Sequence, residues 1–122
     1  MWSSSTPYII DWETATIGNP SIDFFNSAWF LTADADEEKY KAFANSYFKT
    51  NKFKDNINIS AYSAIIEECN WLEFSLKRAL AIESNNINEI NLGKDSIKDS
   101  LTEIINYYNK IPMMLKYCED CM

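Results

Sequence analysis

The chain has 122 residues, which fits a single domain. Eleven Lys and Arg residues stand against 18 Asp and Glu, a net charge of −7 that argues against nucleic acid and anionic membrane surfaces as partners. No stretch approaches the ~20 apolar residues that cross a bilayer. Because residues 1–6 also lack the basic and apolar regions of a signal peptide, we expect a cytoplasmic protein.

The first predicted elements are a short strand and a helix. The β-prone run Tyr8–Ile10 leads directly into polar residues and predicts the strand. Asn19 suits the N-cap of the helix, and Pro20 suits its first position. Asp23 then falls in the first turn, where the positive helix end stabilises a carboxylate. The apolar positions expected to be buried on this helix are Ile22, Phe24, Phe25, Ala28, Trp29 and Leu31.

Three further helices are predicted downstream, since two glycines and three prolines leave few breaks. Asp34–Asp36 caps the second helix, which ends near Thr50, and Ser60 caps the third, which ends near Glu83. Residues 84–93 read as a loop, and the fourth helix spans about 94–111 before Pro112 ends or kinks it. The predicted stripes are Tyr40, Phe43, Ala44, Tyr47 and Phe48 on the second helix; Ile65, Ile66, Cys69, Leu72, Leu76, Ala79 and Leu80 on the third; and Ile97, Leu101, Ile104, Ile105 and Tyr108 on the fourth.

The three cysteines do not predict a disulfide framework, because their number is odd. Cys69 lies in the apolar stripe of the third helix and is expected in the core. Cys118 and Cys121 form a C-x-x-C pair, which elsewhere performs redox chemistry or provides half a zinc site. With no second pair and no histidine in the chain, a frayed and reduced tail is the favoured interpretation.

The candidate chemistry is concentrated near the predicted strand. With no histidine, Ser-His and Cys-His nucleophilic schemes are excluded within these residues, and two glycines cannot form a glycine-rich phosphate loop. Asp11 follows the strand directly and Glu13 comes two residues later. Mg²⁺ takes one or two such carboxylates together with phosphate oxygens. The alternative is that Asp11 forms a turn by bonding its own backbone.

The segment Ile9-Ile10-Asp11-Trp12-Glu13, followed by Gly18-Asn19-Pro20 and Asp23-Phe24, resembles the aminoglycoside phosphotransferase and choline kinase family. In that family an apolar strand ends in Ile-Asp-Trp/Phe-Glu and precedes a Gly-Asp/Asn-Pro turn and a helix with a second Asp. The resemblance covers Tyr8 to about Phe30. It implies a protein-kinase-like fold and transfer of the γ-phosphate of ATP or GTP to a small-molecule hydroxyl, such as that of an aminoglycoside or choline.

The resemblance also implies roles for three carboxylates. Asp11 matches the family's metal-binding Asp, which holds Mg²⁺ against the nucleotide phosphates. Asp23 matches the helix Asp that braces the catalytic loop through hydrogen bonds. Glu13 matches a common family residue that would neighbour the substrate or the metal.

The chain departs from the family pattern at the catalytic loop. The family places a His-Gly-Asp loop just upstream of the strand, whereas here Met1–Pro7 precede it and there is no histidine. We therefore expect a mainly α domain over residues 1–122, with about four helices and a short N-terminal strand, equivalent to the distal part of a kinase-like C-lobe. The catalytic base and the nucleotide lobe with its Lys are expected to be missing, so that Mg²⁺ and ATP belong to the complete enzyme and this chain alone binds neither and is inactive.

Two kinds of partner follow from this expectation. The chain either docks on the missing N-terminal lobe or self-associates as a homo-oligomer, because cutting the lobe at the strand would expose an edge and an apolar face. That face is expected to include some of five aromatic residues, Trp2, Tyr8, Trp12, Phe24 and Trp29. The alternative function is a helical binding or assembly module without catalytic activity, in which Asp11 holds no metal.

Overall fold

The computed structural model describes residues 2–3, 6–7, 18–54 and 56–122, which are mostly helical. The predicted strand over Tyr8–Ile10 lies outside these residues. The described elements in chain order are the antiparallel pair β1 (Trp2–Ser3) and β2 (Thr6–Pro7), α1 (Pro20–Leu31), α2 (Glu37–Phe48), the one-turn α3 (Ile57–Ser60), α4 (Ser63–Ala79) and α5 (Ile87–Cys121). The predicted mainly α fold with about four long helices is therefore confirmed.

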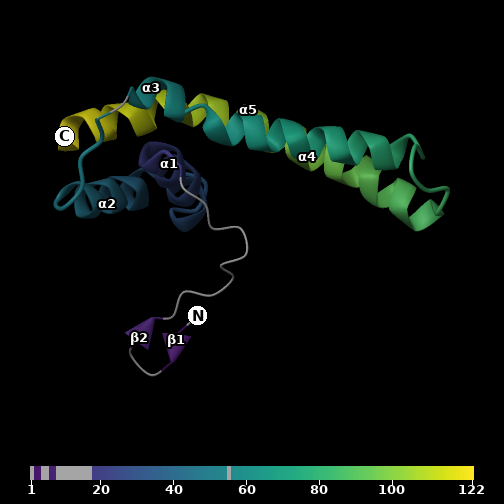
Figure 1. The fold of residues 1–122 in the computed structure, drawn as a ribbon, viewed down its shortest axis with the longest axis horizontal. Helices are drawn as coiled ribbons and strands as arrows, with labels where there is room; N and C mark the ends of the chain where they lie inside the picture. The colour runs from purple at the N-terminus through teal and green to yellow at the C-terminus, as the bar shows by residue number, and fades with distance from the viewer. Residues whose placement is uncertain (1, 4–5, 8–17, 55) are drawn as a thin grey trace.

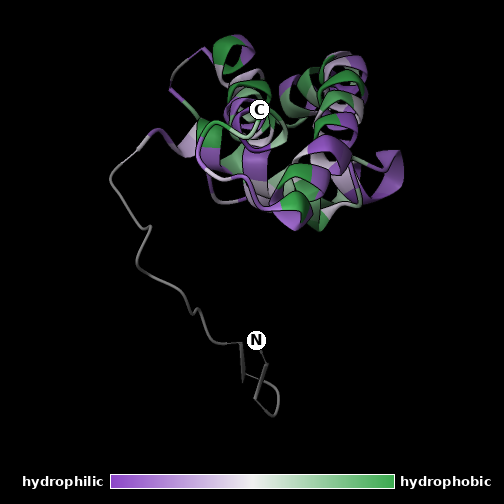
Figure 2. Ribbon diagram, turned by 90° about the vertical axis from the view of Figure 1, so that its right-hand side faces the viewer, coloured by the Kyte–Doolittle hydropathy of each residue, from purple (hydrophilic) through white to green (hydrophobic). Residues whose placement is uncertain are grey.

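Two long helices define the shape of the helical part. α4 and α5 run side by side as a hairpin, and α1, α2 and α3 gather near the end of α5 that carries the C terminus (Figure 1). Hydrophobic and hydrophilic residues alternate along the helices, as expected of amphipathic elements (Figure 2). Among the described residues, no helix has both the length and the apolarity to cross a membrane.

The predicted helix starts at Asn19 and Asp36 are confirmed. Asn19 Oδ1 accepts a hydrogen bond of 2.9 Å from the Ser21 backbone N–H, and Pro20 occupies the first helical position of α1. Asp36 Oδ1 accepts a bond of 3.1 Å from the Lys39 N–H at the start of α2. Each cap satisfies a backbone donor that the helix itself leaves unpaired, so both boundaries are fixed by local chemistry.

The core between α1 and α2 is aromatic. Phe24 contacts six neighbouring rings at centroid distances from 4.8 to 6.3 Å: Phe25, Tyr40, Phe43, Tyr47, Phe48 and Phe53. The predicted α2 stripe is confirmed, with Tyr40, Ala44 and Phe48 buried. On α1 the prediction is wrong for Ile22 and Leu31, which are exposed, because the core contacts only one face of this helix.

Several downstream boundaries differ from the prediction. Ser60 ends the short α3 instead of capping a long helix, and α4 stops at Ala79. The predicted 84–93 loop is too long, since Asn86 caps α5 by accepting a 2.9 Å bond from the Asn88 N–H. Pro112 does not end α5, which continues to Cys121. Proline removes only one hydrogen bond from this helix, and burial of residues beyond it maintains the helical conformation.

The contact between α4 and α5 is close at Gly93. A Cβ atom added to Gly93 would lie 2.6 Å from the Ala79 backbone N and 2.8 Å from both the Ser75 carbonyl oxygen and Arg78 Cβ. Gly93 therefore serves as a packing residue within a helix, where the sequence suggested a loop end. Small side chains at Ser75 and Ser100, both buried, also line this contact.

The stripes predicted to be buried on the third and fourth helices are only partly covered, and the prediction is wrong for seven of their twelve residues. Ile66, Cys69, Leu76 and Leu80 on α4, and Leu101, Ile105 and Tyr108 on α5, are exposed. The other five are half-buried: Ile65, Leu72, Ala79, Ile97 and Ile104. The two helices face each other with smaller or partly buried residues, which leaves the main apolar rows uncovered.

The second half of α5 completes the core with Tyr107, Ile111, Met114 and Cys118, all buried. Tyr107 packs edge-on against Trp29 of α1 at 4.9 Å between ring centroids. Its hydroxyl is buried, with no hydrogen-bond partner among the described residues. The nearby Tyr40 hydroxyl, by contrast, lies 3.4 Å from Cys118 Sγ. Burial raises the pKa of both phenols, so both stay protonated near neutral pH.

Gly93→Ala is expected to lower the free energy of unfolding by about 1–3 kcal/mol, because the new methyl group collides with α4 backbone atoms that cannot rotate away. The matched control is Gly18→Ala, where a Cβ meets no atom of the described residues within 4 Å and the expected change is below about 0.5 kcal/mol. Urea unfolding followed by circular dichroism measures both. Equal stability of Gly93→Ala and wild type would contradict the close α4–α5 approach.

Removing the two buried phenolic hydroxyls should have opposite effects. Tyr107→Phe eliminates an unpaired buried polar group and should raise the free energy of unfolding by about 1 kcal/mol, whereas Tyr40→Phe loses the bond to Cys118 and should lower it by about 0.5–1 kcal/mol. Urea melts of the two variants in parallel provide the comparison. Destabilisation of both to the same extent would show that the Tyr107 hydroxyl has a partner.

Candidate functional site

The predicted site residues divide between described and undescribed parts of the chain. Asp11 and Glu13 lie outside the described residues. Asp23 is described and lies exposed in the first turn of α1, as predicted. Within the described ranges it forms no ion pair, so the bracing partner that the resemblance implies is not found there.

The start of α1 is anchored to α3 through two buried serines. The Ser21 hydroxyl lies 2.7 Å from Asn19 Oδ1 and 2.5 Å from Ser60 Oγ. Both Ser21 and Ser60 are buried, so these polar contacts are shielded from water. This anchor fixes the direction in which the first turn of α1, including Asp23, leaves the Gly18–Pro20 turn.

Asp23 acts electrostatically on the aromatic face of α2. Burial, and to a lesser extent the negative charge of Asp23, raise the pKa of Tyr47. The half-buried Tyr47 packs on Phe24, the residue that follows Asp23 in α1, at a centroid distance of 4.8 Å. Asp23 therefore stands at the edge of the aromatic core, where its carboxylate meets solvent.

The described residues contain no group of three or more Asp, Glu, Cys or His side chains arranged to hold a metal ion. The two carboxylates that the sequence assigned to a metal or its surroundings, Asp11 and Glu13, lie beyond the described ranges.

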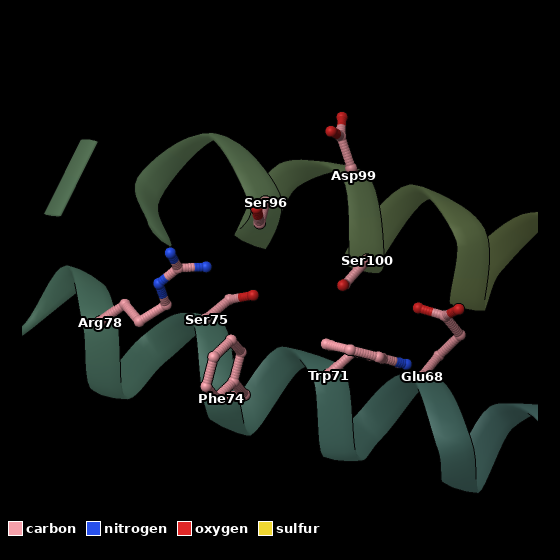
Figure 3. A pocket seen from close by; sticks show the side chains of 8 residues that line it. All are labelled: Glu68, Trp71, Phe74, Ser75, Arg78, Ser96, Asp99 and Ser100. Atoms are coloured by element: carbon pink, nitrogen blue, oxygen red, sulfur yellow. The ribbon is translucent and has the colours of Figure 1, made fainter. Parts of the chain in front are cut away.

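A groove of about 310 Å³ lies between α4 and α5, and the sequence did not predict it. Figure 3 shows Glu68 and Arg78 reaching from α4 toward α5, while the Asp99 carboxylate is directed away from α4. The spacing of Trp71, Phe74 and Arg78, at steps of three and four on one side of α4, was the available signal. The residues that line the groove are Glu68, Trp71, Phe74, Ser75, Arg78, Ser96, Asp99 and Ser100.

Charge is distributed unevenly along this groove. At one end, Arg78 is paired with Glu89 through a 2.9 Å bond from Nε, and its guanidinium carbon lies 5.1 Å from the centre of the Phe74 ring. At the other end, the pKa of Glu68 is raised, mainly by burial and further by the negative charges of Glu103 and Glu67. A hydrogen bond with Ser100 lowers this pKa but does not cancel the rise. Carboxylates beside exposed aromatic rings suit an organic cation better than a phosphate.

The C-x-x-C pair is part of the core and not a frayed tail, so that prediction is wrong. Cys118 is buried, and burial, aided by the charges of Cys121 and Glu119 and opposed by the Tyr40 hydrogen bond, raises the pKa of its thiol to about 11. Cys121 donates a hydrogen bond of 3.0 Å to Asn45 Oδ1. Cys69, predicted in the core, is exposed. All three cysteines are free thiols, and Cys118 has neither the exposure nor the lowered pKa of a redox-active cysteine.

Residues 1–56 match the model of the phosphotransferase enzyme family. The match contains the predicted motif from Asp11 to Phe24, together with the described α1 and α2, and it supports a phosphotransferase-like origin for this part of the chain. No curated protein and no solved structure matches the chain.

The burial of the thiols predicts their order of alkylation. At pH 8 and low micromolar protein, we expect iodoacetamide to modify Cys69 first and Cys118 only on unfolding, since a pKa of about 11 leaves on the order of 0.1% thiolate. Peptide mass mapping over time measures each rate, and the same reaction in urea, where all three thiols should react alike, is the control. Rapid native modification of Cys118 would contradict its place in the core.

Proposed function

We propose that this chain forms the distal part of the C-lobe of an ATP-dependent phosphotransferase that acts on a small-molecule hydroxyl. The match of residues 1–56 to the phosphotransferase enzyme family carries the proposal. The capped start of α1 supports it, because the turn at Gly18–Pro20 leads into a helix whose first turn bears Asp23, in the order found in the aminoglycoside phosphotransferase and choline kinase family.

In this proposal Asp11 would hold Mg²⁺, which neutralises charge on the nucleotide phosphates during transfer. Glu13 neighbours that metal or the acceptor. Asp23 braces the catalytic loop, a role that its exposed place on an anchored helix start supports. Rigid placement matters here, since phosphoryl transfer depends on positioning and charge neutralisation more than on covalent chemistry by the protein.

The 122 residues do not themselves contain the full set of catalytic groups that the resemblance implies. They include no histidine for a His-Gly-Asp loop and too few glycines for a glycine-rich phosphate loop. The proposal therefore assigns the catalytic base, the second metal ligand and the nucleotide lobe to a complementary polypeptide segment, which would be the partner of this chain in the active enzyme.

The proposed acceptor is an alcohol that carries positive charge, such as an aminoglycoside or choline. The net charge of −7 favours approach of a cation over approach of an anion. The α4–α5 groove, with Glu68 beside Trp71 and Phe74, adds a local environment of the kind that recognises organic cations.

The test is an assay of Mg·ATP-dependent phosphorylation of choline, an aminoglycoside and an uncharged alcohol. We expect no turnover above the buffer blank by the 122-residue chain, and turnover of a cationic acceptor when a segment bearing the His-Gly-Asp loop, sought in the DNA upstream of Met1, is produced together with it. Asp11→Asn should then lower the rate at least about 1000-fold, because the metal loses its protein carboxylate.

Asp34→Asn is the matched control, since Asp34 is an exposed carboxylate in the α1–α2 turn, outside the proposed site. It should leave the rate unchanged. Turnover by the 122-residue chain alone that depends on Asp11 would contradict the assigned division of catalytic groups. Equal rates for Asp11→Asn and wild type in the complemented enzyme would contradict the metal-binding role. If the chain and the complementary segment together show no phosphotransferase activity and bind no ATP, the alternative of a helical assembly module is favoured.

A further inference from the structure

Two exposed apolar rows run along the α4–α5 hairpin. On α4 the row follows helical steps of three and four through Ile66, Cys69, Glu73, Leu76 and Leu80. On α5 a similar row passes through Lys94, Lys98, Leu101, Ile105 and Tyr108. The six large apolar members are 41–69% exposed: Ile66, Leu76, Leu80, Leu101, Ile105 and Tyr108.

The two rows lie on the same side of the hairpin. Ser75 and Ser100 are buried where the helices meet, and their preceding neighbours, Phe74 and Asp99, line the groove described above. Since consecutive residues of a helix point about 100° apart, the following neighbours project to the opposite side. Leu76 and Leu101 therefore share the face opposite the groove, which we call the hairpin face: the six apolar residues above with Cys69, Glu73, Lys94 and Lys98.

The hairpin face is large enough for a stable interface. Six large side chains at roughly half exposure leave on the order of 600 Å² of apolar surface, at the upper end of the range for the largest patch on a monomer. A standard interface buries ~800 Å² per partner, and the polar members of the two rows can supply the remainder. No described element of the chain covers this surface.

The charges on the hairpin face favour a second copy as the occupant. Although the chain carries a net charge of −7, this face bears one carboxylate, Glu73, and two lysines, Lys94 and Lys98. Two copies can therefore approach through it without strong repulsion. Within α4, Glu73 Oε1 pairs with Lys77 Nζ at 2.8 Å. Packing α4 of one copy against α5 of the other would bring the second carboxylate oxygen of Glu73 to Lys94 or Lys98.

We propose that two copies of this chain associate through the hairpin face, forming a four-helix bundle from two α4–α5 hairpins. A two-fold axis through the face makes the interface self-complementary, as symmetric dimers require. This face differs from the one expected from the sequence, of which Phe24 and Trp29 are buried in the core of a single chain, while Trp2, Tyr8 and Trp12 lie outside the residues whose side chains are described. The proposal goes beyond the proposed function and does not depend on it.

The test is sedimentation velocity over a range of concentrations, comparing the wild-type chain with a variant that carries two added carboxylates in the hairpin face. Wild type should be monomeric at low micromolar concentration and dimeric by several hundred micromolar. Leu101→Glu combined with Ile105→Glu should raise the dissociation constant at least about 100-fold, because two carboxylates per copy would be buried against apolar surface. Leu31→Glu is the control: it changes an even more exposed leucine, on α1 and outside the hairpin face, and should leave the dimer intact.

A second measurement does not depend on variants. Cys69 belongs to the hairpin face, so its alkylation rate should fall at least about tenfold as protein concentration rises through the dimer transition, whereas the rate at Cys121, which lies outside the face, should stay constant. A wild-type monomer at several hundred micromolar would overturn the proposal. Dissociation by Leu31→Glu, or a Cys69 rate independent of concentration in a dimeric sample, would overturn it as well.

Discussion

The ring of Phe24 is the contact on which the α1–α2 part of the structure depends. Six aromatic rings surround it, from both helices and from the segment after α2. Because neighbouring residues of a helix point about 100° apart, burying Phe24 directs the preceding Asp23 toward solvent. The Asp-Phe pair in the phosphotransferase-like segment therefore combines a packing residue with an exposed carboxylate, and the packing of one sets the position of the other.

The family match ends at residue 56, where Asn56 caps α3. The matched part is nevertheless not an independent structural unit. Trp29 of α1 packs on Tyr107 of α5, and Ser21 of α1 contacts Ser60 of α3, so the unmatched half of the chain completes the core of the matched half. A change in α5 can therefore disturb the predicted site region without touching a carboxylate, through the packing of α1.

The sequence predicted those features that depend on local chemistry. Asn19 and Asp36 were identified as caps because a cap bonds residues two or three positions away, and the α2 stripe was identified because its whole face meets one core. Periodicity also revealed the rows on α4 and α5, but an apolar row does not specify what covers it, and their predicted burial was wrong. Gly93 was predicted to end a loop, whereas it lies within α5 and packs against α4. That role could not be predicted locally, because the contacting α4 residues are more than ten positions away in the chain. The site was predicted least completely, because the α4–α5 groove forms only when the two helices are brought together.

The position of Pro112 has a mechanical consequence. Gly93 and Ser100 in the N-terminal part of α5 face α4, whereas Tyr107 and Ile111 before Pro112, and Met114 and Cys118 after it, belong to the core with α1 and α2. Proline has no N–H to bond the carbonyl four residues earlier, which is that of Tyr108, and this lowers the resistance of the helix to bending at that turn. Because buried core residues flank Pro112 on both sides, the weakest turn of α5 is held inside the core, and the packing around it supplies the resistance to bending that the missing hydrogen bond does not.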